Sequence, residues 1–425
     1  MAELAIAGGE PCVKEPVEIR WPVVDERDVE HVAEVVRAAR GGWSRWSIAE
    51  GEDTTFEEKW AAFQQARHCL LVANGTVAIE CALKGLGLEP GDEVIVTSLT
   101  FIASASAILI ARGVPVFADI IPETFQIDPD DVERKITERT RGIVVVHYGG
   151  YPTDMTRILE VARRHGLFVL EDSAHAHGSE WEGRRVGAIG DAGTFSFEGS
   201  KSLPCGEGGA IVTNREEVYE ACWAYHHIGR ILGSEKYDHQ AIGPNLRLSE
   251  LQAAVLHGQF ERLLDQIRRR MATAARLRQG LREVPGIEPL QEDARVTQRG
   301  FYYFVMRFDE ATWGVRRDTF VAAVKAEGCR PVSVGYGMPV YQMALFARNT
   351  FDYTGYPVAG RPAYGRAFDY KDVRCPNAER AAHHEQITWS QRNLLHPQAA
   401  ENLLTVFGKL WENRAELQRY QEEQA

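Results

Sequence analysis

The sequence predicts an α/β fold: a central, mostly parallel seven-stranded sheet with helices on both faces, followed by a smaller α/β domain. Between residues 54 and 213, short segments that are apolar throughout alternate with amphipathic helical segments. Such strands are typical of parallel sheets that are buried on both faces. A long helical segment, 249–284, ends at Pro285-Gly286 and is expected to join the two domains. The seven predicted strands are 69–73, 93–97, 115–118, 142–147, 167–171, 193–197 and 209–213.

The other elements follow from local signals. Glycines and prolines in residues 1–25 indicate an extended arm, and valines on one face of 25–40 predict a helix. Residues 334–376 are rich in Gly, Tyr and Pro and are expected to form a long irregular loop, of the kind that is usually functional or mobile. The expected division is an N-terminal arm and helix (1–50), a large domain (51–264) and a small C-terminal domain (265–425). Further helices are predicted at 54–66, 77–86, 101–111, 129–137, 155–165, 216–225, 316–327, 378–388 and 397–420, with a strand at 301–308.

The composition narrows the class of protein. Of the 425 residues, 44% are hydrophobic and 25% charged, as in soluble globular proteins. A net charge of -12 argues against a nucleic-acid or anionic-membrane partner. The seven cysteines include no C-x-x-C pair, which favours reduced thiols. No signal peptide is recognisable, and no run approaches the roughly 18 apolar residues of a membrane span. We therefore expect a cytoplasmic protein.

One lysine stands out by its surroundings. Lys201 lies in a loop between two predicted buried strands, with a Pro-Cys step and three glycines after it. Burial in such a loop can keep a lysine amine neutral, and a neutral amine is the form that attacks a carbonyl group. Taken alone, the loop is better explained as a surface hairpin that carries a solvated lysine, so the rest of the chain must decide.

Polar residues follow the predicted strands at their carboxyl ends, where parallel sheets bind ligands. Gly75 and Thr76 precede a helix, where exposed N–H groups and a hydroxyl suit a phosphate. Asp172 could pair with a protonated pyridine nitrogen, and His175 could donate a hydrogen bond to a phenolic oxygen. His175 and His177 make a poor metal site because no third ligand follows nearby, so we expect no metal.

With these residues in place, the chain resembles the DegT/DnrJ/EryC1 family of aminotransferases. The resemblance implies the fold-type I architecture, pyridoxal 5'-phosphate as cofactor, and keto-sugars or keto-cyclitols as amino acceptors. The matching motifs, in order, are Asn74-Gly75-Thr76, Thr97-Ser98-Leu99-Thr100-Phe101, His147-Tyr148-Gly149, Glu171-Asp172-Ser173-Ala174-His175, Phe195-Ser196-Phe197, Ser200-Lys201 and Asn245-Leu246-Arg247.

The resemblance also implies a role for each matched position. Lys201 would hold the cofactor as an internal aldimine and move the proton between substrate and cofactor. Asp172 would pair with the pyridine nitrogen, His175 would lie near the ring oxygen and Phe101 would stack on the ring. Gly75, Thr76 and Ser196 would bind the phosphate. Asn245 of the partner subunit would complete that site, which implies a homodimer with shared active sites.

The substrates are less sharply indicated. The resemblance to glutamine-dependent cyclitol aminotransferases of aminoglycoside (antibiotic) pathways favours glutamine or glutamate as donor and a keto-cyclitol as acceptor. A nucleotide-linked keto-sugar, an aminohydroxybenzoate synthase-like reaction and a non-catalytic regulatory relative are the alternatives. Arg45, Arg230 or Arg247 could bind the donor carboxylate. The chain departs from its relatives at Glu198-Gly199, next to the lysine. Candidate substrate contacts are His147, Tyr148, His226, His227 and Arg247.

Overall fold

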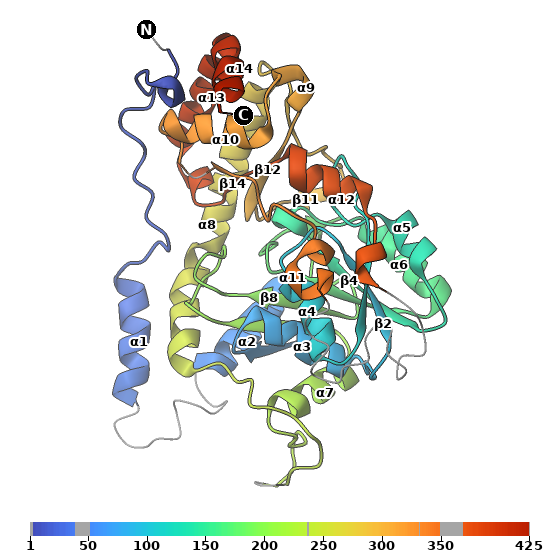
Figure 1. The fold of residues 1–425 in the computed structure, drawn as a ribbon. Coiled ribbons are helices and arrows are strands. Elements are labelled where there is room, and N and C mark those ends of the chain that lie inside the picture. The colour runs from blue at the N-terminus through green and yellow to red at the C-terminus, as the bar shows by residue number, and fades with distance from the viewer. Residues whose placement is uncertain (1–2, 39–51, 236–237, 331, 349–368, 425) are drawn as a thin grey trace.

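A seven-stranded mixed sheet forms the centre of the larger part of the molecule (Figure 1). The computed structural model describes residues 3–38, 52–235, 238–330, 332–348 and 369–424. The strand order is β1, β9, β8, β5, β4, β2, β3. Only β9 is antiparallel to its neighbours, so the predicted, mostly parallel sheet is confirmed. The strands are β1 (His68–Val72), β2 (Glu93–Thr97), β3 (Val114–Ala118), β4 (Thr140–Val146), β5 (Phe168–Asp172), β8 (Ala192–Ser196) and β9 (Gly209–Thr213).

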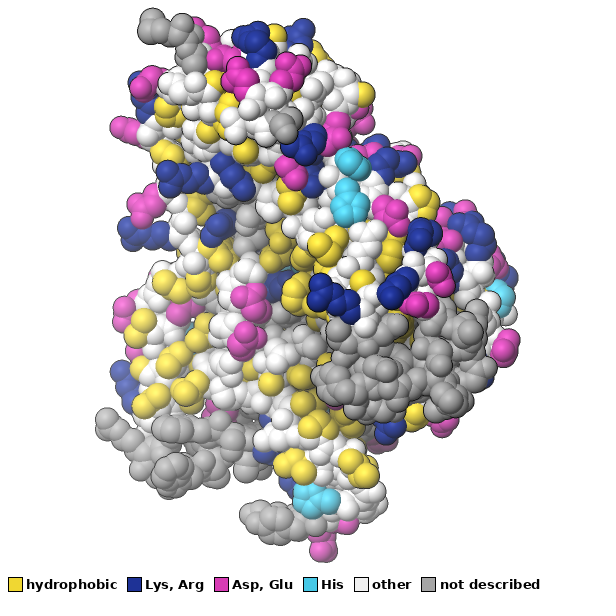
Figure 2. Space-filling model, viewed as in Figure 1, with side chains coloured by type: hydrophobic (Ala, Val, Ile, Leu, Met, Phe, Trp, Pro, Cys, Tyr) yellow, Lys and Arg dark blue, Asp and Glu magenta, His cyan; other side chains and the backbone are white. Residues whose placement is uncertain are grey.

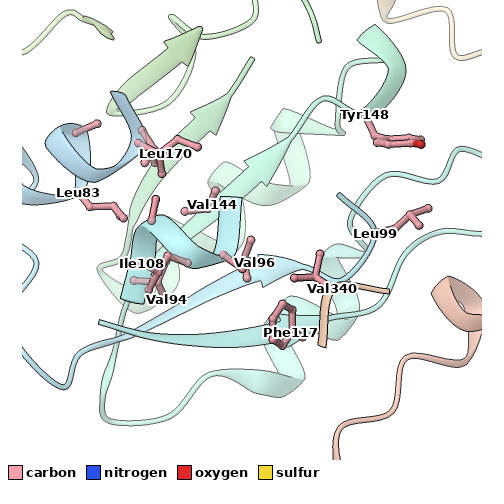
Figure 3. Packing of buried hydrophobic residues seen from close by; sticks show 14 of the residues in the cluster. Leu83, Val94, Val96, Leu99, Ile108, Phe117, Val144, Tyr148, Leu170 and Val340 are labelled. Atoms are coloured by element: carbon pink, nitrogen blue, oxygen red, sulfur yellow. The ribbon is translucent and has the colours of Figure 1, made fainter. Parts of the chain in front are cut away.

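Helices cover both faces of this sheet. Alternate side chains of a strand point to opposite faces, so Val94 and Val96 pack under α3, α4 and α7, as Figure 3 shows in part. Ile95 and Ile143 pack on the other face with α5 and α6. Apolar residues are needed at every strand position for this reason. The helices are α2 (Glu52–Gln64), α3 (Gly75–Gly85), α4 (Ala103–Ile110), α5 (Pro129–Lys135), α6 (Met155–His165) and α7 (Glu216–His226).

A long helix connects this core to a second one. The first half of α8 (Glu250–Leu281) packs beside the large sheet through Leu256 and Leu263, and its end enters the C-terminal core through Leu277. In Figure 1, α8 runs from beside the large sheet up to the C-terminal helices, and α1 (Glu26–Ala38) lies beside its lower half. The long helix was predicted to link two domains, and it does join two cores. The exact domain boundaries stay a prediction.

The second core surrounds a four-stranded sheet in the order β10, β12, β14, β13. Its strands are β10 (Ile287–Pro289), β12 (Tyr303–Phe308), β13 (Val332–Ser333) and β14 (Gln386–Ser390). A small third sheet is formed by β6 (Glu180–Trp181), β7 (Arg184–Arg185) and β11 (Val296–Gln298). The C-terminal helices are α9 (Glu310–Trp313), α10 (Arg317–Ala326), α11 (Ala344–Ala347), α12 (Pro376–Arg380), α13 (Pro397–Glu412) and α14 (Arg414–Glu423).

Two predictions for the C-terminal part are corrected. The helix predicted at 378–388 ends early, because 386–390 forms β14 and pairs with β12. That pairing is a tertiary contact, which overrides local preference. The described parts of 334–376 are short helical turns that pack on the large core. Val340 is fully buried near Phe117, and its N–H donates to the Ser98 carbonyl at 2.9 Å (Figure 3).

Candidate active site

The carboxyl ends of β1, β5 and β8 meet at one edge of the large sheet. After β1, the side chain of Asn74 accepts a hydrogen bond from the Val77 N–H at 3.1 Å and caps α3. The backbone of Gly75 approaches the end of β8 so closely that a Cβ there would lie 2.7 Å from Ser196 Cβ. Gly75, Thr76 and Ser196 therefore lie together at a helix N-terminus, where backbone N–H groups suit a phosphate.

Asp172, the last residue of β5, is held from two sides. The Ser104 hydroxyl donates to Oδ2 at 2.7 Å, and the Ala174 N–H donates to Oδ1 at 3.1 Å. Because Ser104 gives its hydrogen to a carboxylate, the Thr100 hydroxyl 3.0 Å away must be the donor to Ser104. Asp172 is 5% exposed, and it has no ion-pair partner among the described residues. This buried, unpaired carboxylate fits a protonated ring nitrogen.

Lys201 lies in a loop that is closed at its base. We call residues 197–208 the lysine loop; Gly199 N–H donates to Gly206 O at 2.9 Å, and Cys205 N–H donates to Phe197 O at 2.8 Å. The Lys201 amine, Nζ, lies 4.3 Å from the ring centroid of Tyr302. The His175 ring stacks on the same ring at a centroid distance of 4.1 Å. Tyr302 thus brings the predicted lysine and histidine to one place.

His175 is held as a neutral imidazole. Burial, and secondly the charge of Lys201, lower the pKa of His175 well below its ordinary value. The Gly149 N–H donates to Nδ1 at 3.4 Å, so the ring proton is on Nε2, which lies 3.4 Å from the Tyr336 hydroxyl. A neutral ring with this tautomer can donate a hydrogen bond from Nε2 to an oxygen atom.

Glu198, three residues before Lys201, binds within the lysine loop. Its carboxylate accepts from the Ser200 hydroxyl at 2.5 Å and from the Ser200 N–H at 3.1 Å. Because the Ser200 hydroxyl donates to Glu198, the Tyr302 hydroxyl 2.9 Å away donates to Ser200. Trp21 and Gln391 donate to the loop carbonyls of Gly199 and Ser200 at 3.1 and 3.2 Å. Contacts from distant parts of the chain therefore hold the loop that carries Lys201.

Two of the predicted substrate contacts are enclosed by protein. Both ring nitrogens of His147 are used: Nδ1 accepts from the Thr153 N–H, and Nε2 donates to Glu171, each at 3.0 Å. Glu171 also accepts the N–H groups of Gly187, Ile189 and Gly190. The hydroxyl of the buried Tyr148 accepts a hydrogen bond from the side-chain nitrogen of Gln386. This geometry favours supporting roles for His147 and Tyr148, behind the Tyr302–His175 pair.

The other candidates lie after α7, beside the end of β1. Burial, and then Arg247 and Arg230, lower the pKa of His227 to about 4. Burial first, and then His227, lower the pKa of His226 to about 3. Asn245 is exposed, and its side-chain oxygen accepts from Arg247 Nε at 3.0 Å. Within one chain, His227 and Asn245 therefore contact mainly Arg230 and Arg247.

Phe101 is 51% exposed, and its ring centroid lies 6.0 Å from that of Tyr336. Arg45 lies outside the described residues.

His177 does not share the surroundings of His175. Its ring lies among Trp60, Phe195 and Phe197, and neither of its nitrogens has a hydrogen-bond partner in the described structure. Across the described ranges, no group of three or more His, Cys, Asp or Glu side chains could hold a metal ion. No helix in the same ranges is long and apolar enough to cross a membrane.

Sequence reasoning missed several residues of this site. Ser104 lies on a predicted helix, but nothing local indicates that its hydroxyl faces Asp172. Tyr302 lies within the strand predicted at 301–308, directly before the observed β12, and no motif marks it; only its distance from Lys201 in space reveals it. The predicted Gly75, Thr76, Ser196, Asp172, His175 and Lys201 do gather at one edge of the sheet.

Comparisons with known proteins agree with this geometry. The model of the DegT/DnrJ/EryC1/StrS aminotransferase family matches residues 25–401. A protein of Micromonospora echinospora, provisionally named L-glutamine:3-amino-2,3-dideoxy-scyllo-inosose aminotransferase, is 38% identical over 98% of this chain and 99% of its own. The L-glutamine:scyllo-inosose aminotransferase of Streptomyces griseus is 34% identical over 98% and 100%. The crystal structure of 3-amino-5-hydroxybenzoic acid synthase matches with a TM-score of 0.82 at 30% identity, over 94% and 100%. The predicted fold-type I architecture is confirmed.

Proposed function

Because the chain belongs to the DegT/DnrJ/EryC1/StrS aminotransferase family, whose members use pyridoxal phosphate, we propose that it moves an amino group from glutamine or glutamate to a keto-cyclitol. The names of two relatives with near-complete coverage support a cyclitol acceptor and glutamine as donor. A role in aminoglycoside or related biosynthesis follows from such an acceptor. A nucleotide-linked keto-sugar is the second candidate for the acceptor.

The observation that carries the proposal is the buried carboxylate of Asp172, at the edge where Lys201 lies. It has hydrogen-bond donors but no cationic partner among the residues that the structure describes. Pyridoxal phosphate, when bound, supplies an electron sink for the bond that breaks at Cα. Asp172 would keep the proton on the ring nitrogen, and the N–H groups around Gly75 would bind the phosphate. His175 Nε2–H would donate to the ring oxygen, and the Lys201 amine would carry the proton at Cα.

The cofactor and the donor are tested by colour. The protein purified with pyridoxal phosphate is expected to be yellow because of a visible absorption band. This band should disappear when glutamine or glutamate is added. Lys201→Ala should lack the band of the wild-type protein, because it has no amine to bond the cofactor. A colourless wild-type protein, or one that no amino acid bleaches, would contradict the proposal and favour a non-catalytic relative.

The acceptor is tested in the second half-reaction. After the donor has been removed, keto-cyclitols and nucleotide-linked keto-sugars are offered in turn, and return of the band identifies the acceptor. We expect scyllo-inosose or a deoxy form of it to restore the colour. Restoration by a nucleotide-linked sugar alone would replace the cyclitol by the second candidate. Formation of an aromatic amine would instead place the reaction with 3-amino-5-hydroxybenzoic acid synthase.

We also propose that the active unit is a homodimer in which Asn245 serves the site of the partner. Asn245 is exposed, and its side-chain N–H groups have no acceptor within the described residues. It follows a segment that protrudes at the bottom of Figure 1 and carries hydrophobic side chains in Figure 2. Ile242 there is 97% exposed, and Ile228 and Leu232 are also exposed. Exposed apolar side chains gathered on one segment favour a protein partner.

Subunit complementation tests the shared site. Asn245→Ala and Lys201→Ala are each expected to be inactive, but mixed dimers contain one site with both residues. Random exchange at equal amounts makes half of the dimers mixed, with one complete site in two, so about a quarter of wild-type activity should return. No recovery, despite exchange shown by light scattering and tagged subunits, would mean that Asn245 serves its own chain.

A further inference from the structure

A cavity of about 350 Å³ lies beside the lysine loop. Ser200 and Tyr302 form one side of it, Trp21 closes it from the N-terminal arm, and the ends of β13 and β14 form the rest. The amine of Lys201 lies 4.3 Å from the ring centroid of Tyr302. The ring of Tyr302 therefore contacts the Lys201 amine and also lines the cavity, next to Ser200. An α-amino acid fits in this volume.

Two cations without partners line the cavity. The guanidinium groups of Arg330 and Arg392 have no hydrogen bond or ion pair within the described part of the chain. No carboxylate lines the cavity among the described residues. The neighbouring carboxylate of Glu198 already accepts two hydrogen bonds from Ser200. Guanidinium groups bind carboxylates with two parallel N–H donors, so this wall suits a carboxylate ligand.

A third polar group distinguishes the cavity from a simple anion site. Gln391 lines it and is 1% exposed. Its side-chain nitrogen donates to the Ser200 carbonyl at 3.2 Å, which settles the orientation of the amide. Its side-chain oxygen is buried and has no donor in the described structure. The cavity thus offers two cations and one free acceptor, which complements the carboxylate and N–H groups of an amino acid.

We infer that this cavity receives the amino-acid donor, with Arg330 and Arg392 binding its α-carboxylate and Gln391 accepting an N–H. The inference rests on the proposed function, since it assigns the donor subsite of the same reaction. It replaces Arg230 and Arg247 as the carboxylate ligands, since both of these bind His227 beyond the end of β1, at 3.2 and 3.3 Å. The donor carboxylate and a phosphate on the acceptor share the same anionic chemistry, so the test separates the two half-reactions.

The test uses the cofactor-loaded protein titrated with L-glutamine and with 2-methylglutamate. The methylated analogue has no Cα proton to lose, so its effect on the visible band reports binding without turnover. Arg392→Ala and Arg330→Ala should each raise the apparent Kd of both ligands by about 10- to 100-fold. The apparent Kd of Arg392→Lys should lie between those of wild type and Arg392→Ala, because one ammonium group replaces a bidentate guanidinium donor. Arg316→Ala, at an exposed position on the same domain, should bind like wild type.

The outcomes separate this inference from the proposed function. If no amino acid changes the band of the wild-type protein, the proposed function fails and the donor subsite with it. If wild type responds and both arginine variants bind the ligands equally well, only the subsite assignment is wrong. Slower return of the band with the acceptor, at unchanged donor Kd, would assign the arginines to an acceptor anion and overturn the inference. Weaker donor binding with an unchanged acceptor half-reaction supports it.

Discussion

The Ser104 hydroxyl lies 2.7 Å from Asp172 Oδ2 and is itself 3.0 Å from the Thr100 hydroxyl. This relay brings the helix after β2 into contact with the end of β5. The carboxylate that faces the proposed ring nitrogen is therefore positioned by neutral donors, which leave its charge uncompensated.

Replacement of Ser104 tests that relay. Ser104→Ala removes one donor to a buried carboxylate, so cofactor affinity should fall about tenfold, with a loss of folding free energy of about 1 kcal/mol. Equilibrium dialysis of pyridoxal phosphate and urea unfolding measure the two effects. Ser106→Ala, on the same helix, is the control and should change neither. Unchanged cofactor affinity in Ser104→Ala would show that Asp172 needs no positioning by this helix.

The close approach of Gly75 to Ser196 predicts that position 75 tolerates no side chain. In Gly75→Ala the new Cβ would lie 2.7 Å from Ser196 Cβ, so α3 or β8 must move. We expect a loss of about 1–3 kcal/mol in the free energy of unfolding and weaker cofactor binding. Gly408→Ala on α13 meets nothing within 4 Å and should gain about 0.5–1 kcal/mol. A stable Gly75→Ala protein with full cofactor affinity would contradict the assignment of Gly75 and Ser196 to the phosphate site.

We expect the folded protein to need the negative charge of the Glu171 carboxylate for its stability. It is fully buried and accepts four hydrogen bonds, one from His147 and three from the backbone at 187–190. Glu171→Gln would turn an N–H2 group toward these donors and should destabilise the protein by about 2–4 kcal/mol in urea unfolding. The exposed Glu182→Gln should change stability by less than about 0.5 kcal/mol. An equally small change in Glu171→Gln would mean that the loop rearranges around the amide.

Because His177 is buried as a neutral ring, we expect the folded protein to become less stable as the pH is lowered. Burial, and then Lys201, lower the pKa of His177 to about 3, against an ordinary 6.5. Below pH 6.5 the unfolded chain binds a proton that the folded chain rejects, so the free energy of unfolding falls as pH decreases toward 3. His177→Phe should reduce this slope by about 1.1 kcal/mol per pH unit on average between pH 6.5 and 5.

Urea unfolding at three pH values in that window measures the slope, while most carboxylates stay ionised. The exposed His165→Gln is the control and should leave the slope as in wild type. An unchanged slope in His177→Phe would show that His177 is protonated in the folded protein.

Much of the site could be predicted because its parts are local. Strands that are apolar throughout, a glycine at a helix start and a lysine among glycines are each visible within a few residues. Parallel strands bring their carboxyl ends to one edge, so Gly75, Asp172 and Ser196 are expected at the same edge once the sheet is inferred. Which of them are neighbours depends on the strand order, which the structure gives. The motifs that resemble a known family added the roles of Lys201 and His175.

The remaining features depend on contacts between distant segments. Tyr302 meets Ser200 across 102 residues, and Gln391 meets the same residue across 191. Residues 386–390 form a strand because β12 and β13 offer pairing partners on its two sides.

The sequence by itself determined the order of strands and helices along the chain, the polar residues at the strand ends and the family resemblance that implies the cofactor. Hydrophobic periodicity and turn residues act over short stretches, so they can be read locally. Only the tertiary structure decided that Ser104 holds Asp172, that Tyr302 lies beneath Lys201, and that Arg330 and Arg392 share a cavity with the lysine loop. The first relation depends on how α4 packs against the large sheet, and the other two depend on how the C-terminal part packs against the lysine loop. No short-range pattern encodes either packing.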